Sequence, residues 1–522
     1  MKEKSKTMHT ISGTVSKSAF MGLIFVIYSL LFTAGYAGAA PLRAGVAKVN
    51  ITYWESGGIV KDSAYARALV LENGSTKLVI LSVDVKNVNA FLDNVRSQIK
   101  KELNIEPANV LINSSHLHTH RDDHPDVDKR IVIAVKEAWQ KRVPVNVGAG
   151  SGYDDRIGEN KRLKLKNGKE WEIRLANPLP PDEEIAGITP ADPEIGVLRL
   201  DRKDGSPLAV LYNYACHATF ELVKEFERDK TGWEKVPTSA DYPGYASRVI
   251  ENNLGDGAIA MFIQGFAGDI HPARYKDVNN PKDAELWGGM LGISTLQAVN
   301  KIQSKSTSEL KIIDEIIKLP RRTDLPQRIA ALETEQEELV KSFRGTSLDL
   351  KSFIPLYIKY NLSPEYPSYN SHIYLRDEML GKEDWERLDA DNRLNLKKYV
   401  ENIYAMEKLA RIQENLTHLR RRLAEREKAG SETMDVEIQG VRIGNFVLIT
   451  FPGEVSSGVG LNIKKMSPDE FTFVAGYTNG SIGYVPTTVQ FKGEDYSDIN
   501  CPLAAEWQKI YEEKVMEILK KL

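Results

Sequence analysis

Cysteine is scarce in this sequence: Cys216 and Cys501 are the only two among 522 residues. Two cysteines exclude a disulfide-rich scaffold and a cysteine-based zinc module, and the sequence leaves open whether they pair. A surplus of basic residues is also missing, because 69 Lys and Arg stand against 72 Asp and Glu, so no nucleic-acid partner is expected. Long hydrophobic runs are absent after residue 40, which predicts no transmembrane segment in the mature chain.

The first 40 residues have the pattern of an export signal. Four lysines between Lys2 and Lys17 precede an uncharged apolar run at about 19–34, and small residues in an A-x-A arrangement follow at 35–40. An uncleaved membrane anchor is the alternative, because the run is close to the lower limit of about 17 residues for spanning a bilayer. We expect residues 1–40 to be a cleaved signal peptide and the protein to be periplasmic or extracellular.

From residue 41 onward, short apolar runs alternate with amphipathic helical patterns. Residues 78–85 predict a strand that is buried on both faces, and the spacing of apolar residues over 91–103 predicts a helix after it. Further apolar runs lie at 110–113, 209–212 and 258–263, each followed by a polar turn. Strand, turn and helix in this order predict an α/β fold, with a mixed β-sheet core flanked by helices.

Residues 323–430 differ from the rest of the chain. Asp324 and Pro326 are typical of a helix start, and apolar residues spaced by threes and fours from Leu396 to Leu423 predict a long helix. We interpret the segment as a helical hairpin inserted into one domain of residues 41–522; a separate coiled-coil domain is the alternative. The strand pattern returns at 436–450.

Several predicted strands end in polar or glycine-rich turns. These turns are residues 114–120, 215–217, 264–269, 452–454 and 478–480. In α/β sheets the functional crevice lies beyond the carboxyl ends of the strands. The sequence therefore predicts that these turns meet in one site.

The histidines are few and clustered. Six of the nine lie in three short segments: His116, His118, His120, His124, His217 and His271. Side chains two apart in an extended chain point to the same side, so the first three are expected to converge. Zinc takes three or four N, O or S ligands and often leaves one position for water. The alternatives are hydrogen-bonded surface histidines, a structural His217, and a Glu454 that only favours a helix N-terminus.

Taken in order, these segments resemble the catalytic domain of the neutral ceramidases, a family of exported zinc-dependent amidases. The matching stretches are residues 44–52, His118-Thr119-His120, Asn213–Thr219 with His217, Gly268–Pro272 with Asp269, Pro452-Gly453-Glu454, and Asn479–Pro486 with Tyr484. The resemblance covers the chain from about residue 42 to its end, except for the helical segment.

The resemblance implies a zinc ion bound by His118, His217, Glu454 and Tyr484, with His120 beside it facing the substrate. Tyr484 enters on the resemblance alone, since a tyrosine in such a segment is usually a core residue. Asp269 is implied either to organise its glycine-rich turn or to act as a general base.

The sequence also departs from the family pattern. The catalytic serine of the family is replaced by His271, which leaves water on the zinc as the attacking group and makes His271 a catalytic candidate. Charged residues at 121–124 replace the family's small ones, which argues against a lipid chain at that place. The family's C-terminal β-domain is not expected in this chain.

The sequence thus predicts an exported zinc-dependent hydrolase that cleaves a small-molecule or lipid-like amide. His120, Tyr484 and the metal would stabilise the developing oxyanion, and Arg121 and Arg274 would orient the substrate through forked hydrogen bonds. An esterase or another metal-dependent hydrolase is one alternative. A catalytically degenerate scaffold, in which the hairpin docks a partner, is the other. The substrate, the number of metal ions and the oligomeric state stay open.

Overall fold

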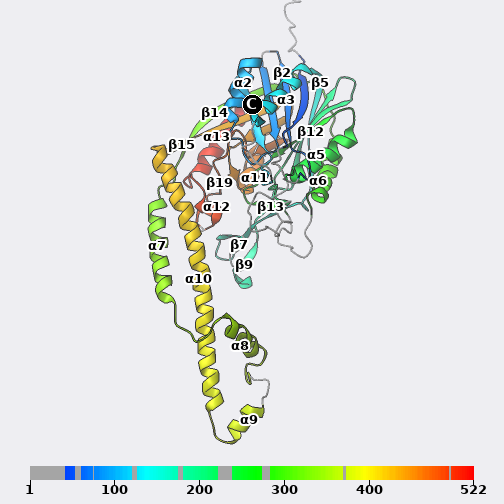
Figure 1. Ribbon diagram of the computed structural model, residues 1–522. Coiled ribbons are helices and arrows are strands. Elements are labelled where there is room, and N and C mark those ends of the chain that lie inside the picture. Colours follow the sequence, from blue (N-terminus) through cyan, green and yellow to red (C-terminus); the bar gives the residue numbers. More distant parts are fainter. Residues whose placement is uncertain are drawn as a thin grey trace, which may run out of the picture.

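The structure is a computed structural model that describes residues 41–52, 60–74, 76–119, 126–173, 180–220, 238–272, 283–367, 372–492 and 495–522. A rounded α/β body carries a long helical arm (Figure 1). The predicted signal peptide, residues 1–40, lies outside the described residues. Within them, no helix combines the length and the apolar character that crossing a bilayer requires.

The larger sheet has eight strands in the order β12-β11-β10-β5-β1-β2-β3-β4. Their bounds are β1 Arg43–Asn50, β2 Tyr65–Asn73, β3 Thr76–Val83, β4 Val110–Ser114, β5 Val143–Tyr153, β10 Glu194–Arg202, β11 Pro207–Tyr214 and β12 Ile259–Gln264. The β3–β4 and β11–β12 pairs at the two edges are parallel, and the pairs between them are antiparallel. The predicted mixed sheet is therefore confirmed.

A four-stranded sheet packs against one face of the larger sheet. Its strands are β14 Leu310–Pro320, β15 Thr433–Ile443, β16 Phe446–Thr450 and β18 Thr472–Ala475, in that spatial order. Leu69 and Ile80 of the large sheet share one buried cluster with Leu448 and Phe473 of the small one. Alternating side chains of each strand thus fill the space between the sheets, where burial of apolar surface stabilises the stack.

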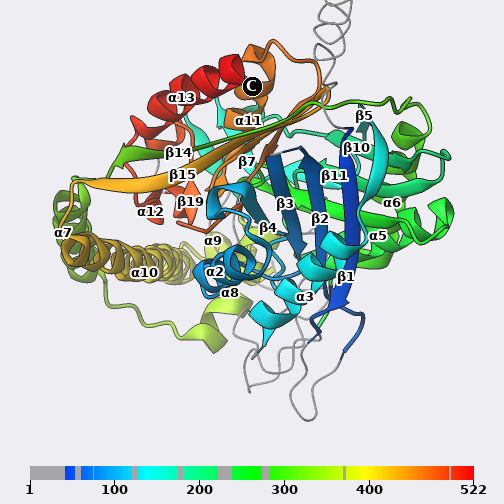
Figure 2. The same cartoon turned by 90° about the horizontal axis from the view of Figure 1, so that it is seen from above.

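Helices cover the outer faces of both sheets and complete four layers (Figure 2). On the large sheet lie α2 Leu92–Leu103, α3 Val127–Gln140, α5 Asp241–Leu254 and α6 Ala284–Val299. On the small sheet lie α11 Ser457–Met466 and α13 Trp507–Lys521. Short elements border the ends of the strands: β6 Gly158–Asn160, β7 Arg162–Leu165, β8 Glu170–Glu172, β9 Ile185–Ile188, β13 Ile270–Pro272, β17 Glu454–Val455, β19 Tyr484–Val485 and α12 Tyr496–Ile499.

The two edge strands of the large sheet approach each other. The backbone N–H of Gln264, at the end of β12, donates to Asn113 Oδ1 at the end of β4 (2.8 Å). Ser82 Oγ in β3 donates to the carbonyl oxygen of Phe262 in β12 (2.6 Å). This closure brings the ends of β4, β11 and β12 to one place, although these strands are far apart in sequence.

The arm is an insertion between β14 and β15, which are antiparallel neighbours in one sheet. Its helices are α7 Leu325–Ser342, α8 Leu350–Leu362, α9 His372–Met379 and α10 Asp384–Ala429. With 46 residues, α10 is about 69 Å long. In Figure 1, α7 runs beside α10, and α8 and α9 lie toward the far end. The predicted helical insertion is present, with two more helices than a simple hairpin.

Gly45 in β1 is required by the close packing of α3 on the sheet. A Cβ atom at this position would overlap the carbonyl oxygen of Ala138 in α3. We expect Gly45→Ala to lower the free energy of unfolding by roughly 2–3 kcal/mol, because neither backbone has room to move apart. Gly289→Ala is the control, since nothing lies within 4 Å of a Cβ there, and it should stabilise α6 by about 0.5–1 kcal/mol. Urea unfolding of both variants measures the difference; equal effects would contradict this account of the packing.

Candidate metal centre

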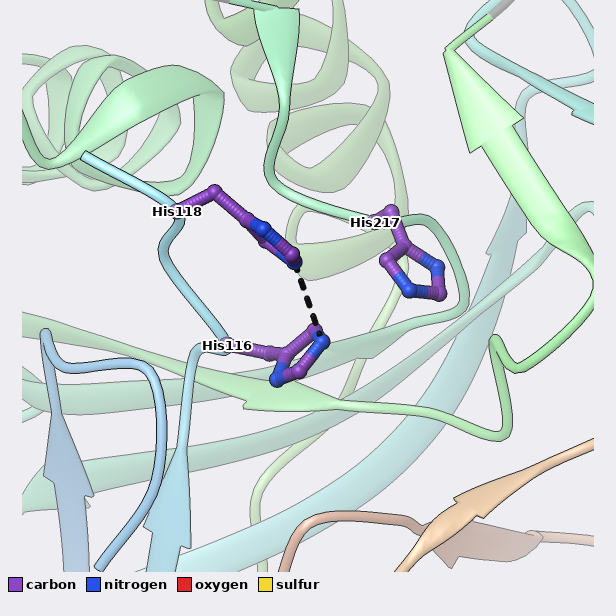
Figure 3. A group of neighbouring side chains, drawn as sticks. All are labelled: His116, His118 and His217. Carbon is purple, nitrogen blue, oxygen red and sulfur yellow. Dashed lines mark hydrogen bonds between the residues drawn. The ribbon is translucent and has the colours of Figure 1, made fainter. Parts of the chain in front are cut away.

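The segment after β4 turns sharply at His116, whose φ of 57° lies in the left-handed region that residues other than glycine rarely adopt. The turn places His116 Nε2 3.2 Å from His118 Nε2 (Figure 3). His116 Nδ1 is 3.0 Å from the carbonyl oxygen of Lys86, which holds the ring in place. The two side chains converge as predicted, but the expectation of an extended chain was wrong at His116.

His217 and Glu454 reach the same point from other segments. His217 follows β11 and is completely buried, with Nδ1 3.0 Å from the carbonyl oxygen of Ile270. Its Nε2 lies 3.3 Å from Glu454 Oε2. The same carboxylate oxygen lies 3.5 Å from His116 Nε2. Glu454 therefore contacts histidines from two distant parts of the chain.

These separations fit a metal ion. In a tetrahedral zinc site with bonds of about 2.0–2.1 Å, neighbouring donor atoms lie roughly 3.3–3.4 Å apart. The three separations measured here, 3.2, 3.3 and 3.5 Å, are close to that value. The ligand atoms of His116, His118 and His217 all lie within 4.8 Å of one another.

The protonation states also suit a metal. Burial lowers the pKa of His118 well below its ordinary value, and burial lowers the pKa of His217 as well. Burial opposes ionisation of Glu454, yet His116 and His217 together hold the pKa of Glu454 well below its usual range. Neutral imidazoles and an ionised carboxylate are the forms that bind a metal.

Two tyrosines border the cluster. Tyr484 in β19 is the parallel partner of Glu454 in β17, and burial together with the nearby Glu454 raises the pKa of its phenol well above the ordinary value. Tyr477 stacks on His116 with ring centroids 4.0 Å apart, and its φ is 51°. Its hydroxyl is buried without a hydrogen-bond partner in the described part of the chain, as expected beside a ligand site.

The glycine-rich turn after β12 packs against the backbone of Glu454, one of the residues of the cluster. A Cβ atom at Gly268 would overlap the carbonyl oxygen of Glu454, so only glycine allows this approach. Asp269 is buried and accepts hydrogen bonds from the Ser457 N–H (2.7 Å) and from Asn160 Nδ2 (3.1 Å). These contacts connect the turn to β6 and to the first residue of α11.

Comparison with known proteins identifies this architecture. No protein-family model matches the sequence, and no curated protein sequence is significantly similar to it. The crystal structure of neutral ceramidase from Pseudomonas aeruginosa matches with a TM-score of 0.57 at 16% identity, over 92% of this chain and 74% of that one. The chain has the neutral ceramidase fold. A ceramidase complexed with C2 matches with a TM-score of 0.56 at 15% identity, over 92% and 75% of the two chains.

The predicted resemblance to the neutral ceramidases is thus confirmed at the level of the fold, and the low identity marks a divergent form of it. Within this fold the residues predicted from the sequence divide into two groups. His118, His217, Glu454 and Tyr484 lie together, and His271 stacks on His217 with ring centroids 4.5 Å apart and 9° between the rings. His120, Arg121, His124 and Arg274 lie outside the described residues.

Two features of the site were not predicted from the sequence, and one open question is answered by the structure. His116 was expected to converge with His118, but not to contact Glu454 as well. Tyr477 had only one signal, its place directly before a predicted turn. The cysteine pairing that the sequence left open is not formed: Cys216 and Cys501 are both buried free thiols.

A buried charge cluster made of Lys161, Arg162, Glu172 and Asp495 supports Tyr484. Lys161 Nζ lies 4.9 Å from the centre of the Tyr484 ring and 2.8 Å from Glu172 Oε1. Arg162 is completely buried and bridges Asp495 (2.8 Å) and Glu172 (3.4 Å). The site wall therefore depends on charges that are almost completely buried, with Arg162 and Glu172 at 0% side-chain exposure.

The histidines make the metal-free protein sensitive to acid. Burial lowers the pKa values of His118, His217 and His271 below the ordinary 6.5, so below about pH 6.5 the unfolded chain binds protons that the folded chain does not. Stability therefore rises with pH through this range and falls as the pH drops below it. We expect the Tm of chelator-treated protein to decrease between about pH 7.5 and 5.5 in scanning calorimetry. His271→Leu should flatten this slope, and an unchanged slope would contradict the assignment.

Proposed function

We propose that this protein is an exported zinc-dependent hydrolase that cleaves an amide bond. One observation carries the proposal: imidazoles and a carboxylate from three distant segments place their donor atoms 3.2–3.5 Å apart in the neutral ceramidase fold. The ion would be held by His116, His118, His217 and Glu454, whose donor atoms give these separations. Tyr484, the parallel strand partner of Glu454, would lie beside the ion.

The residues around the ion have separate tasks in this proposal. A zinc ion bound here would supply a Lewis acid that polarises a carbonyl group and activates water. Tyr484 keeps its proton because the pKa of its phenol is raised, so its hydroxyl can donate a hydrogen bond to a developing oxyanion. The pKa of His118 is lowered by burial, and the neutral imidazole is the form that can bind the ion through Nε2. His271 would position His217 through the stacked rings.

The substrate class rests on the fold. The two solved structures compared above are both called ceramidases, so N-acyl sphingoid bases are the first substrates to test. His120, Arg121 and Arg274 stay candidates for contacts with the polar part of the substrate. An ester would present the same carbonyl to the same site, so esters belong in the same test.

Two measurements test the proposal. Elemental analysis of the purified protein should find one zinc ion per chain, and a panel of N-acyl and ester substrates should show amide cleavage that a chelator abolishes and zinc restores. Faster cleavage of esters would favour the esterase. A folded protein that binds no metal and cleaves none of the panel would favour the scaffold.

A further inference from the structure

A cavity of about 270 Å³ lies between β1–β2 and α5, away from the histidine cluster. Its charged lining consists of Lys48, Lys61, Arg67, Arg248, Asp62 and Glu251. Four cations and two carboxylates line the cavity, and Asp84 and Glu285, which are not part of the lining, pair with Arg67 and Arg248. The aromatic rings of Tyr65 and Tyr245 form part of its wall.

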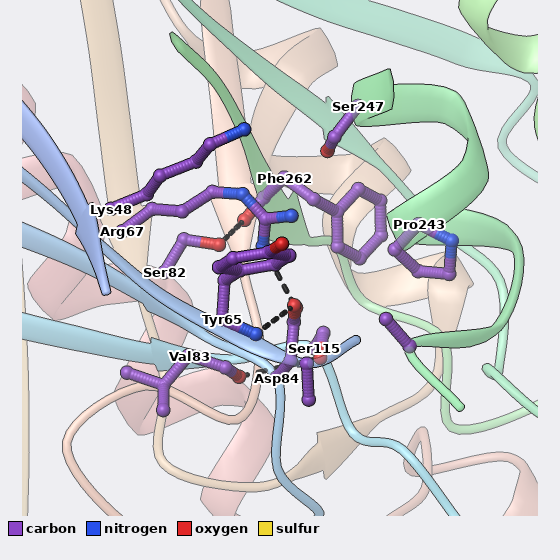
Figure 4. A network of polar contacts seen from close by, with 12 residues as sticks. Lys48, Tyr65, Arg67, Ser82, Val83, Asp84, Ser115, Pro243, Ser247 and Phe262 are labelled. Carbon is purple, nitrogen blue, oxygen red and sulfur yellow. Dashed lines mark hydrogen bonds and ion pairs between the residues drawn. The ribbon is translucent and has the colours of Figure 1, made fainter. Parts of the chain in front are cut away.

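Two of the cations are direct cross-strand partners. Lys48 in β1 pairs with Arg67 in β2, and both side chains extend past the Tyr65 ring (Figure 4). Lys48 Nζ and Arg67 Cζ each lie 5.2 Å from the centre of that ring. Like charges directly opposite each other destabilise a sheet, so this pair needs compensation. Each cation has one acidic partner: Glu251 for Lys48 (2.5 Å) and Asp84 for Arg67 (2.7 Å).

The compensation is incomplete at Arg67. This side chain is only 3% exposed, and its Nη1 donates a hydrogen bond to Asp84 Oδ2 (2.7 Å). Its Nε is buried with no hydrogen-bond partner in the described part of the chain. A guanidinium group has five donors, and buried donors are rarely left unpaired. Arg67 belongs to the wall of the cavity, so a ligand with acceptor atoms bound there would lie beside this guanidinium group.

We propose that this cavity is a binding site for a small phosphate-type dianion. Arg67 would supply a fork of donors from the floor, and Lys48 a second cation beside it. Arg248, half-exposed and with its Cζ 4.6 Å from the centre of the Tyr245 ring, would close the rim. A tetrahedral oxyanion fits because its acceptors point in several directions, as these donors do.

The cavity is separate from the histidine cluster, and a chain of hydrogen bonds connects the two. Asp62 accepts a hydrogen bond from Ser239 Oγ, and the carbonyl oxygen of Ser239 accepts one from Thr119, the residue after His118. The inference does not depend on the proposed function, because nothing in the cavity ligates the metal.

Isothermal titration calorimetry with inorganic phosphate tests the proposal on the purified protein. We expect saturable binding of one phosphate per chain. Arg248→Gln at the rim and Arg67→Lys at the floor should each weaken it by about ten-fold or more, the effect of one charge-assisted hydrogen bond. Arg420→Gln is the matched control, because Arg420 on the arm is also 52% exposed and also pairs with one glutamate. It should bind phosphate like the unmodified protein.

His217→Ala separates this site from the metal centre. Phosphate binding that persists in His217→Ala and is lost in Arg248→Gln supports the cavity. Binding that is lost in His217→Ala but persists in both arginine variants would place the anion at the metal and overturn the proposal. Absence of saturable binding would also overturn it, since the cavity would then hold only water. If Arg67→Lys fails to fold, phosphate titration of Arg248→Gln alone tests the proposal, because Arg248 is exposed and its replacement should leave the fold intact.

Discussion

His217→Ala should release the metal ion and reduce amide hydrolysis by at least about 10³-fold. Loss of a single oxyanion donor costs about 10²–10³ in kcat, and loss of the ion removes a larger source of charge stabilisation. Glu454→Gln should have a similar effect. Its carboxylate oxygen contacts both His116 and His217, and a neutral amide is a poor replacement for that charge. Zinc content by elemental analysis and kcat/KM for the best amide substrate measure both effects.

His418→Ala is the control for these variants. His418 lies on α10 in the arm, where it neighbours Glu414 and the Tyr496 ring, so its replacement should leave zinc content and kcat/KM unchanged. Circular dichroism shows whether each variant is folded. A full zinc content in both His217→Ala and Glu454→Gln would show that the ion, if present, is bound elsewhere, and the proposed mechanism would fail.

Glu172→Gln should lower the free energy of unfolding by about 3–5 kcal/mol, the usual cost of breaking a buried ion pair. The substitution keeps the shape of the side chain and removes the charge that faces Lys161 and Arg162, both buried. Asp435→Asn is the control: Asp435 is 61% exposed and pairs with an exposed lysine, so the change should stay within about 0.5 kcal/mol. Chemical unfolding of the two variants makes the comparison.

The effect of Glu172→Gln should also depend on pH. Burial opposes ionisation of Glu172, but Lys161 and Arg162 lower its pKa from 4.5 to about 2. A carboxylate with a lowered pKa stabilises the folded state above about pH 4.5, and this contribution is lost as the pH falls toward 2. The difference between the variant and the unmodified protein should therefore shrink over that range. A difference that stays constant would show that packing, and not charge, is what the substitution removes.

Local sequence patterns predicted the individual strands and helices better than they predicted which strands pair. The run at 78–85 and the helical spacing at 91–103 correspond to β3 and α2, and the strand pattern at 436–450 corresponds to β15 and β16. These elements follow from side-chain periodicity within one segment. Which strands pair, and in which direction, depends on contacts between segments. The antiparallel centre of the large sheet and its two parallel edges therefore appear only in the structure.

The residues of the site also divide into those that the sequence predicts and those that only the structure reveals. His217 and Glu454 follow strong strand patterns, so their place at strand ends could be predicted. The contact between His116 and Glu454 could not be predicted, because the left-handed turn that directs His116 toward Glu454 has no signature in the sequence. The charged residues of β7 and β8 resemble a solvated surface, and only the packing of α12 against them shows that Arg162 and Glu172 are buried.

The order of strands, turns and helices, the helical insertion and the histidines available to a metal were determined by the sequence, because each depends on neighbours along the chain. The meeting of His116, His217 and Glu454 was decided by the tertiary structure. It needs the approach of β3 and β4 to β12, where hydrogen bonds join residues 151 and 180 positions apart. It also needs the stacking of two sheets, which arises from apolar contacts between distant segments. A donor separation of about 3.3 Å, which a zinc ion needs, is a property of that packing and of no single segment.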